Sequence, residues 1–255
     1  MRLILSMISV LLLSTPAFAG EDVEYTDSGT VLQGYWNPAG AECETAKATV
    51  IIAHQWMGIT EYEKTRADML SKRCYNAFVA DVYGKGVRPK NVDEAGKAAT
   101  IYKNDPTLAR SRMNAAFNKV KGMKGVDDNR IHVIGYCFGG TMALELARSG
   151  AAIKSAHSFH GGLATKNPKQ NPLRPRIFIH HGAEDPFVPA AEVSTFLQEM
   201  AKAEADLTFY QYPQAVHAFT QPNAGNDPKS GVAYNIEADG ISWQRFTDYL
   251  DRASQ

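Results

Sequence analysis

One segment constrains the fold of this chain more than any other: an apolar run, Ile131–Tyr136, that leads into a cysteine between two glycines, Gly135-Tyr136-Cys137-Phe138-Gly139. A helix-forming stretch, residues 141–148, follows at once. Glycines two positions either side of a central residue are typical of a sharp strand-to-helix turn, where larger side chains would collide with the neighbouring backbone. The pattern is the G-x-S-x-G nucleophile elbow with cysteine in place of serine. It predicts that Cys137 stands at a helix N-terminus, where the helix dipole favours a thiolate. The alternative is a buried structural cysteine in a glycine-rich turn.

Apolar and amphipathic segments alternate along the rest of the chain. Short apolar runs predict strands buried on both faces, and the longer segments between them predict helices. The alternation predicts the α/β class, with a mainly parallel sheet flanked by helices on both faces. Turn residues at 26–29 divide residues 24–36 into an antiparallel hairpin at the sheet edge. Further strands are expected at residues 48–53, 77–80, 131–136, 153–159, 176–181 and 207–212, and helices at residues 59–73, 92–122 with a break near 104–106, 141–148, 190–203 and 234–252.

The first nineteen residues are expected to be a signal peptide rather than part of the fold. Arg2 supplies a basic start, residues 3–13 are largely apolar but too short to span a bilayer, and Ala17-Phe18-Ala19 fits a small-x-small cleavage site. Cleavage after Ala19 would place the mature protein in the periplasm or outside the cell, and the alternative is a retained membrane anchor. No later apolar run is long enough to span a membrane, so no membrane contact is expected after cleavage. Residues 20–255 contain no repeat or linker and are expected to form a single domain.

Charge and histidine placement exclude several functions. The chain has 27 basic and 27 acidic residues, so no nucleic-acid partner is expected. Its histidines are scattered and form no Cys/His cluster, so neither a metal nor another cofactor is expected. Nothing in the sequence predicts the oligomeric state.

Three cysteines in an exported chain leave one unpaired if the other two form a bridge. Cys43 and Cys74 each lie just before a predicted strand. Successive parallel strands start at the same sheet edge, so these two cysteines are expected to form a disulfide opposite the elbow. Cys137 would then be free. Three free thiols are the alternative, because pairing cannot be deduced from sequence alone.

A cysteine nucleophile needs a base, and the base needs a group that orients it. In the hydrolase order of nucleophile, acid and histidine, each group stands on a loop after a strand. Of the seven histidines, only His217 follows both the elbow and an acid in such a loop. The acid is Asp185, with Glu184 as its near alternative. A solvated loop histidine is the alternative for His217.

Two backbone N–H groups are expected to form an oxyanion hole. One belongs to Phe138, directly after the cysteine, and the other to the loop after the strand at residues 48–53, most simply to Trp56. Plain pocket lining is the alternative for both side chains. The same strand-end argument places His54 and His160 at the mouth of the crevice as substrate-pocket candidates, with a hydrogen-bonded structural histidine as the alternative.

These motifs together resemble the dienelactone hydrolase family, over about residues 21–250. The resemblance implies an α/β-hydrolase fold and hydrolysis of small esters or lactones through an acyl-cysteine, with Cys137, Asp185 and His217 as the triad. It rests on the stretches His54-Gln55-Trp56-Met57-Gly58, Asp81-Val82-Tyr83-Gly84-Lys85-Gly86-Val87-Arg88-Pro89, Gly135-Tyr136-Cys137-Phe138-Gly139-Gly140, His181-Gly182-Ala183-Glu184-Asp185-Pro186 and His217-Ala218-Phe219.

Two departures from the family pattern concern the substrate pocket. Gln55 stands where similar chains carry a glutamate that takes the thiol proton, so activation of the thiol would fall to His217 and the helix dipole. Gln221 stands where dienelactone hydrolase has one of two arginines that grip a substrate carboxylate, and the match to the other, near Arg88, is ambiguous. Without that pair a neutral ester or lactone is expected as substrate. The competing hypothesis, based on Gln55, is a catalytically idle or slow protein that traps acyl groups.

Overall fold

The computed structural model describes residues 20–169 and 172–254. The expected signal peptide, residues 1–19, lies outside this part of the chain. Among the described residues, no helix combines the length and the apolar character needed to cross a membrane.

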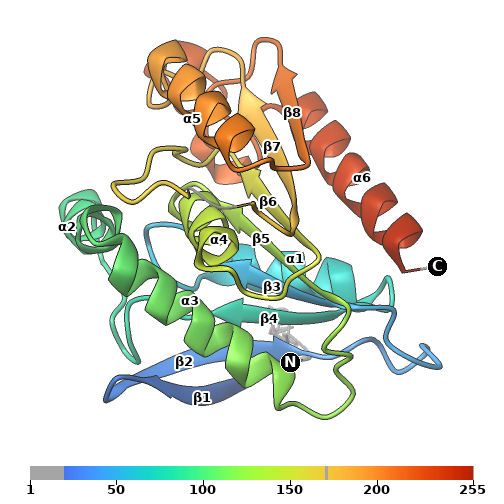
Figure 1. Cartoon of the computed structure of the whole chain (residues 1–255). Helices are drawn as coiled ribbons and strands as arrows, with labels where there is room; N and C mark the ends of the chain where they lie inside the picture. The colour runs from blue at the N-terminus through green and yellow to red at the C-terminus, as the bar shows by residue number, and fades with distance from the viewer. Residues whose placement is uncertain (1–19, 170–171, 255) are drawn as a thin grey trace, which may run out of the picture.

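An eight-stranded sheet forms the centre of the molecule (Figure 1), in the order β1-β2-β4-β3-β5-β6-β7-β8. The hairpin β1–β2 is antiparallel, and β2 joins β4 antiparallel, whereas all pairs from β4 to β8 are parallel. The carboxyl ends of the parallel strands therefore share one edge of the sheet. The strands are β1 (Glu21–Asp27), β2 (Thr30–Asn37), β3 (Thr49–Ala53), β4 (Asn76–Ala80), β5 (Ile131–Tyr136), β6 (Ser155–Phe159), β7 (Arg176–Gly182) and β8 (Leu207–Tyr212).

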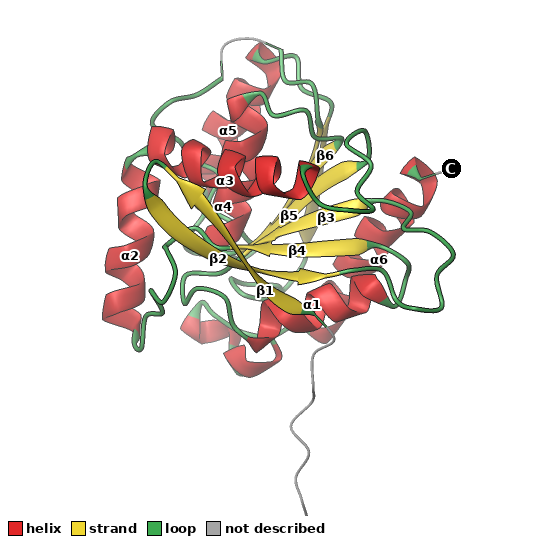
Figure 2. Ribbon diagram, turned by 90° about the horizontal axis from the view of Figure 1, so that it is seen from below, coloured by secondary structure: helices red, strands yellow, loops and turns green. Residues whose placement is uncertain are grey.

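Helices cover both faces of the sheet (Figure 2). On one face, buried side chains of α2, α3, α4 and α5 join a large apolar cluster with the strands. On the other face, α1 and α6 pack against the sheet through residues such as Leu70 and Phe246. The helices are α1 (Glu61–Ser71), α2 (Val92–Asn104), α3 (Pro106–Lys121), α4 (Phe138–Ser149), α5 (Ala190–Lys202) and α6 (Ile236–Ala253), with two short 3₁₀ turns at Pro222–Ala224 and Pro228–Ser230.

Local sequence explains where these elements begin and end. Every residue of β3 is buried, as expected for a continuous apolar run that is covered on both faces. Helix α1 begins after Thr60, which forms a capping box with Glu63. The break between α2 and α3 falls at Asp105, whose side chain accepts from the N–H of Leu108, and Pro106 fits the first turn because its missing N–H would have no helical partner there.

The predicted fold class is confirmed: the chain forms a mainly parallel sheet with an antiparallel edge hairpin and helices on both faces. The predicted strands and helices are all present, and most boundaries agree within two residues. Among the helices, the largest difference is at the start of α4. The helix expected from residue 141 begins at Phe138, directly after the elbow, because the glycines there do not prevent helical backbone once the turn is made. The last helix starts at Ile236 rather than 234, because Asn235 caps it by accepting from the N–H of Ala238.

Cys43 and Cys74 form a disulfide at the sheet edge opposite the elbow, and Cys137 is free. The bridge joins the loop before β3 to the segment between α1 and β4. It closes a loop with a sequence separation of 31 residues. Constraining the unfolded chain over a loop of this length contributes roughly 3 to 4 kcal/mol in the chain-entropy treatment.

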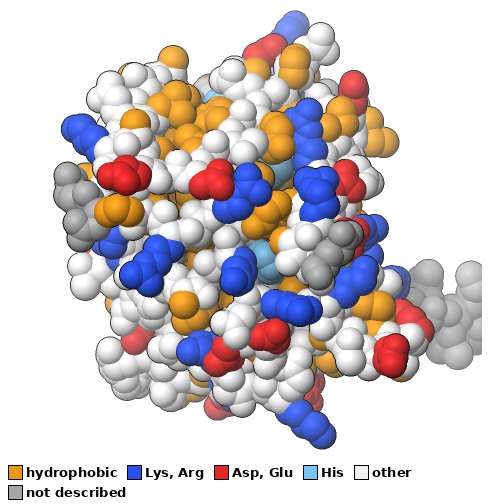
Figure 3. Space-filling model, turned by 45° about the vertical axis from the view of Figure 1, so that its right-hand side comes forward, with side chains coloured by type: hydrophobic (Ala, Val, Ile, Leu, Met, Phe, Trp, Pro, Cys, Tyr) orange, Lys and Arg blue, Asp and Glu red, His pale blue; other side chains and the backbone are white. Residues whose placement is uncertain are grey.

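The surface carries both signs of charge. On the face shown in Figure 3, Lys and Arg side chains are interspersed with Asp and Glu and with apolar groups, in keeping with a formal net charge of zero.

Candidate active site

The elbow holds Cys137 at the carboxyl end of β5, the strand between β3 and β6. Its backbone has φ 55° and ψ −119°, and residues other than glycine rarely adopt such a positive φ. Glycine is needed on both sides. A Cβ on Gly135 would collide with the carbonyl of Gly139, and a Cβ on Gly139 would collide with the carbonyl of Ala53. The turn therefore projects the Cys137 side chain away from the strand, at the first turn of α4.

Three side chains from separate loops meet at this point. The Nε2 atom of His217, in the loop after β8, lies 3.1 Å from the Cys137 Sγ atom. The Nδ1 atom of His217 lies 2.8 Å from Oδ2 of Asp185, which follows β7. The other carboxylate oxygen of Asp185 accepts from the backbone N–H of Phe187 at 2.9 Å, so the carboxylate is held on both sides. Asp185 is buried, and Glu184, its near alternative, makes no contact with the histidine among the described hydrogen bonds.

The contacts favour an ion pair between the sulfur and the imidazole. Burial on its own raises the pKa of the Cys137 thiol, but the hydrogen bond and charge of His217 outweigh it and lower the pKa below its ordinary value. The charge of Lys103 and the N–H of Phe138 act in the same direction. Burial lowers the pKa of His217, whereas Asp185 and Cys137 raise it to about 10. Both shifts describe one proton shared between sulfur and nitrogen, and both favour the thiolate and imidazolium form of the pair.

A cavity of about 240 Å³ opens over the sulfur. Its walls are mostly apolar, and its few polar groups are Cys137, His217, Gln221 and Lys103. Such a mixture suits a small, largely apolar molecule that is oriented by a few polar contacts. The apolar walls come from Trp56, Phe138, Phe187, Val188, Ala218 and Val232.

The two residues expected to supply oxyanion donors both line this cavity. The N–H of Phe138 is directed at the Cys137 sulfur, where it helps to lower the thiol pKa. The Trp56 carbonyl accepts from the Tyr83 hydroxyl at 2.9 Å, which fixes that part of the loop. Among the described residues, no acceptor takes the N–H of Trp56. Within the described residues, neither N–H is thus taken by a backbone or side-chain oxygen.

Gln55 and Gln221 lie at the boundary between this cavity and a neighbouring hollow of about 170 Å³. Gln221 lines both, whereas Gln55 lines only the neighbouring hollow, together with Tyr62 and Thr60. The backbone N–H of Gln55 donates to the buried carboxylate of Glu63 at 3.1 Å. Gln55 is therefore not among the residues that line the cavity over Cys137.

His54 and Arg88 were expected in the substrate pocket, and the structure places neither there. His54 is completely buried, because its ring bridges two loops: Nε2 accepts from the N–H of Val82 at 3.1 Å, and Nδ1 donates to the carbonyl of Gln55 at 2.6 Å. Arg88 turns back on its own loop and donates to the carbonyl of Val87 at 2.8 Å. Its guanidinium also lies 3.8 Å from Asp81.

His160 was also expected at the mouth of the crevice, but it lies beneath the cavity. Only 1% of the residue is exposed. Its Nδ1 atom accepts from the backbone N–H of Cys137 at 3.1 Å, so it contacts the elbow from the protein side.

Several cavity residues could not be recognised from the sequence. Lys103 lies in the last turn of α2, far along the sequence from any strand. It lines the cavity and forms no ion pair or hydrogen bond with another described residue. Val232 reaches the cavity because residues 231–233 pair with His217 through two backbone hydrogen bonds, His217 N–H to Gly231 and Ala233 N–H to His217. Phe187 and Val188 belong to the turn after Asp185. Their proximity to a predicted strand end is the one sequence signal that could have identified them.

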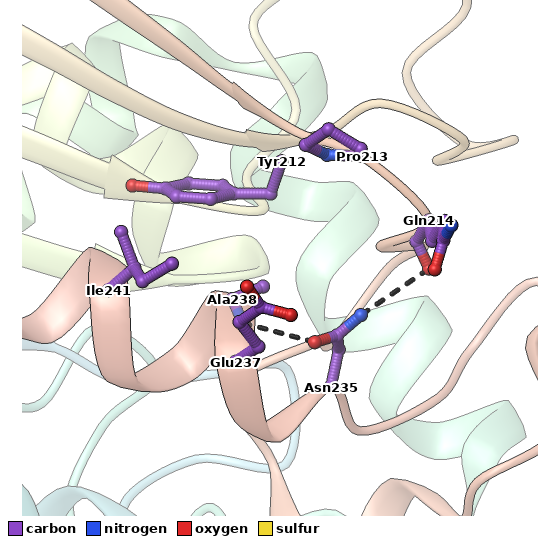
Figure 4. A pocket seen from close by; sticks show the side chains of 7 residues that line it. All are labelled: Tyr212, Pro213, Gln214, Asn235, Glu237, Ala238 and Ile241. Atoms are coloured by element: carbon purple, nitrogen blue, oxygen red, sulfur yellow. Dashed lines mark hydrogen bonds between the residues drawn. The ribbon is translucent and has the colours of Figure 1, made fainter.

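Other hollows in the described structure lack comparable chemistry. One of about 190 Å³ lies between the end of β8 and the start of α6 (Figure 4). It is lined by Tyr212, Asn235, Glu237 and neighbouring side chains, and contains no nucleophile paired with a base. Within residues 20–169 and 172–254, no group of three or more His, Cys, Asp or Glu side chains is arranged to hold a metal ion.

Comparison with known proteins gives a consistent family match. The model of the dienelactone hydrolase family matches residues 37–254. A carboxymethylenebutenolidase of Pseudomonas putida is 21% identical over 217 residues, which cover 83% of this chain and 88% of that protein. An uncharacterised protein of Caenorhabditis elegans, K02A2.1, is 32% identical over 147 residues, covering 56% of this chain and 93% of that protein.

Solved structures agree with the sequence match. The structure titled m3DLH is 29% identical with a TM-score of 0.86, covering 91% of this chain and 97% of that one. A dienelactone hydrolase-like promiscuous phosphotriesterase, P91, from metagenomic libraries is 27% identical with a TM-score of 0.86, covering 92% of this chain and 98% of that one.

Proposed function

Because the chain belongs to the dienelactone hydrolase family, a family of ester and lactone hydrolases, we propose that it cleaves small carboxylic esters or lactones through an acyl-cysteine intermediate. The observation that carries this proposal is the row of contacts from Asp185 through His217 to Cys137, at 2.8 Å and 3.1 Å, beneath a mostly apolar cavity. A nucleophile, a base and a group that orients the base are the requirements for acyl transfer.

The reaction begins with attack of the Cys137 thiolate on the substrate carbonyl. The backbone N–H groups of Phe138 and Trp56 stabilise the oxyanion that forms. The imidazolium of His217 gives its proton to the leaving alkoxide, and the alcohol departs as the acyl-thioester forms. His217, now neutral, accepts a proton from water as that water attacks the thioester, and the acid is released with the thiolate restored. Asp185 keeps the Nδ1 proton of His217 in place throughout.

Gln55 does not prevent this mechanism. His217 contacts the thiol directly and lowers its pKa, so His217 can take the thiol proton without a carboxylate at position 55. The competing proposal, a protein that is acylated but turns over slowly or not at all, predicts that the acyl-thioester accumulates.

Stopped-flow hydrolysis of p-nitrophenyl acetate, with intact-mass analysis of the protein, separates the two proposals. We expect sustained release of p-nitrophenol over many turnovers. Release of one equivalent followed by no further turnover, together with a stable increase in mass on Cys137, would support trapping instead. A panel of lactones and thioesters, measured in the same way, then defines the range of acyl compounds that the cavity accepts.

The cavity favours substrates that carry a negative charge, because Lys103 contributes an ammonium that no described carboxylate neutralises. This preference differs from the neutral substrate expected from the missing arginine pair. We expect Lys103→Met to lower kcat/KM for an ester bearing a free carboxylate by about 5-fold relative to its neutral methyl-ester counterpart. The difference should shrink in 1 M salt. Lys97→Met, an exposed lysine of the same helix that does not line the cavity, is the matched control. Equal effects of the two substitutions would refute the role of Lys103.

We also propose that residues 1–19 are a signal peptide cleaved after Ala19, and that residues 20–255 function as one domain in the periplasm or outside the cell. The Cys43–Cys74 disulfide supports an oxidising compartment. One continuous sheet from β1 to β8 supports a single domain. N-terminal sequencing of the protein from a periplasmic extract tests the cleavage site.

A further inference from the structure

A buried chain of hydrogen bonds begins at the backbone of Cys137 and does not involve its thiol. The N–H of Cys137 is shared between the carbonyl of Phe159, at 3.0 Å, and the Nδ1 atom of His160, at 3.1 Å. His160 has φ 40°, so like Cys137 it holds a backbone conformation that is rare for residues with a side chain. Such conformations persist only where the surroundings enforce them.

The contacts of His160 define which nitrogen carries its hydrogen. Because Nδ1 accepts from the Cys137 N–H, the ring hydrogen must be on Nε2. Nε2 then donates to the hydroxyl of Thr220 at 2.8 Å. The Thr220 hydroxyl in turn lies 2.7 Å from the Tyr62 hydroxyl, to which it can donate. Burial is the main reason why the pKa of His160 lies well below its ordinary value, and the charges of His217 and Arg66 lower it further. The ring is therefore neutral.

The end of this hydrogen-bond chain that lies away from Cys137 is held by a buried cation. Arg66 Nε donates to the Tyr62 hydroxyl at 3.3 Å, and Arg66 Nη2 donates to the Thr220 carbonyl at 3.1 Å and to Asp239 at 2.6 Å. The guanidinium lies over the rings of Tyr62, Tyr136 and Trp243, at 5.0 to 5.5 Å from their centroids. Helices α1 and α6 are thus joined to Thr220 through one rigid group.

Thr220 is three residues after His217, so the chain of hydrogen bonds connects the Cys137 elbow with the His217 loop. The separation of these two segments governs the reaction. His217 and Cys137 contact each other directly through a single 3.1 Å interaction, which is made and broken as the proton moves. The path through His160 and Thr220 involves neither reacting atom. It can therefore hold the elbow and the histidine loop at a constant separation while the proton changes places.

We propose that His160 and Thr220 are positioning residues, which hold the Cys137 elbow and the His217 loop at the separation that the proton transfer needs. This role rests on the proposed function, because it concerns the same reaction. It differs from a purely structural role in one respect: loss of these hydrogen bonds should slow the reaction more than it weakens folding. The reason is that a displacement of about 1 Å between reacting groups costs on the order of 100-fold in rate.

Thr220→Val and Thr220→Ser form the first test. Valine keeps the shape of threonine and removes the hydroxyl, whereas serine retains the hydroxyl. We expect Thr220→Val to lower kcat for p-nitrophenyl acetate about 10-fold to 100-fold with little change in KM, and Thr220→Ser to restore most of it.

Two substitutions of His160 separate its two hydrogen bonds. In His160→Asn the side-chain oxygen can replace Nδ1 as the acceptor for the Cys137 N–H, but the bond to Thr220 is lost. In His160→Gln the amide nitrogen can replace Nε2 as the donor to Thr220, but the acceptor for Cys137 is lost. Since both bonds are needed to join the loops, we expect each variant to lose kcat to a similar extent as Thr220→Val.

His157→Gln is the matched control. His157 lies on β6, the strand that His160 follows, is similarly buried, and has one ring nitrogen bonded to the Ser155 hydroxyl, but it contacts no residue of the cavity. It should lose stability to urea as His160→Gln does, while keeping its kcat. A loss of kcat in His157→Gln equal to that in His160→Gln, or full kcat in folded Thr220→Val, would overturn the proposal.

The rate of Cys137 alkylation by iodoacetamide distinguishes this proposal from the proposed function. If the native protein hydrolyses no ester, the proposed function fails, yet a slower alkylation in Thr220→Val that Thr220→Ser reverses would still support the positioning chain. If the native protein hydrolyses esters and neither rate responds to Thr220→Val, the positioning role fails and the hydrolase proposal stands.

Discussion

Cys137→Ala is expected to lower kcat/KM for ester hydrolysis by on the order of 10⁴-fold, the largest effect of any single substitution in this chain. Alanine removes the atom that forms the acyl-enzyme but leaves the cavity and the two backbone donors in place. The small residual rate would then come from binding and oxyanion stabilisation alone. Steady-state kinetics with p-nitrophenyl acetate measures the loss, and circular dichroism checks that the variant is folded.

His217→Ala should lose nearly as much activity, because without the imidazole the thiolate is no longer stabilised and no group protonates the leaving alcohol. In the native protein the rate of Cys137 alkylation should follow a single ionisation below the ordinary pKa of a thiol, and this ionisation should disappear in His217→Ala. Substantial ester turnover by Cys137→Ala would refute the acyl-cysteine mechanism. Unchanged thiol reactivity in His217→Ala would refute the ion pair.

The second large effect is a loss of stability in mild acid, caused mainly by five of the six buried histidines. Burial lowers the pKa of His54 and His132 to about 4 and that of His180 to about 3, and it holds those of His157 and His160 well below the ordinary value. In the unfolded chain each would take up a proton near pH 6.5. The unfolded state therefore binds more protons below that pH, and stability falls as the pH falls from 6.5 towards 4. Each histidine costs about 2 kcal/mol between pH 7 and pH 5.

Urea unfolding at pH 7.5, 6 and 5 measures this dependence. We expect the free energy of unfolding to decrease steeply over this range, although the raised pKa of buried Glu63 works in the opposite direction. His132→Gln, which removes one such group, should make the slope shallower by about 1.4 kcal/mol per pH unit. Equal stability at pH 7.5 and pH 5 would show that these histidines are already protonated in the folded state.

The order of strands and helices could be predicted because each depends on local patterns. Residues 49–53 are apolar without interruption, and a strand buried on both faces needs that pattern. Asp105 and Pro106 end one helix and begin the next through their own backbone and side-chain bonds. At the last helix, the capping side chain of Asn235 selected the first helical residue.

Chain order also selected the three residues of the proposed triad. Strands of a parallel sheet present their carboxyl ends at one edge, so loops after β5, β7 and β8 are brought together by topology alone. Cys137, Asp185 and His217 lie on those loops, and their contacts follow from that arrangement.

The walls of the cavity could not be predicted in the same way. His54 and His160 both follow strands at the same edge, yet each side chain turns inward and accepts from a buried backbone N–H, that of Val82 for His54 and that of Cys137 for His160. Lys103 lies at the end of a helix, and nothing in its own segment indicates that the helix brings it over Cys137. The sequence alone thus determined the fold class, the elbow and the order of the proposed triad, because strand pattern, glycine spacing and topology are encoded locally. Only the tertiary structure decided which polar side chains face the cavity and which support it from beneath, because that choice depends on hydrogen bonds between segments far apart in the chain.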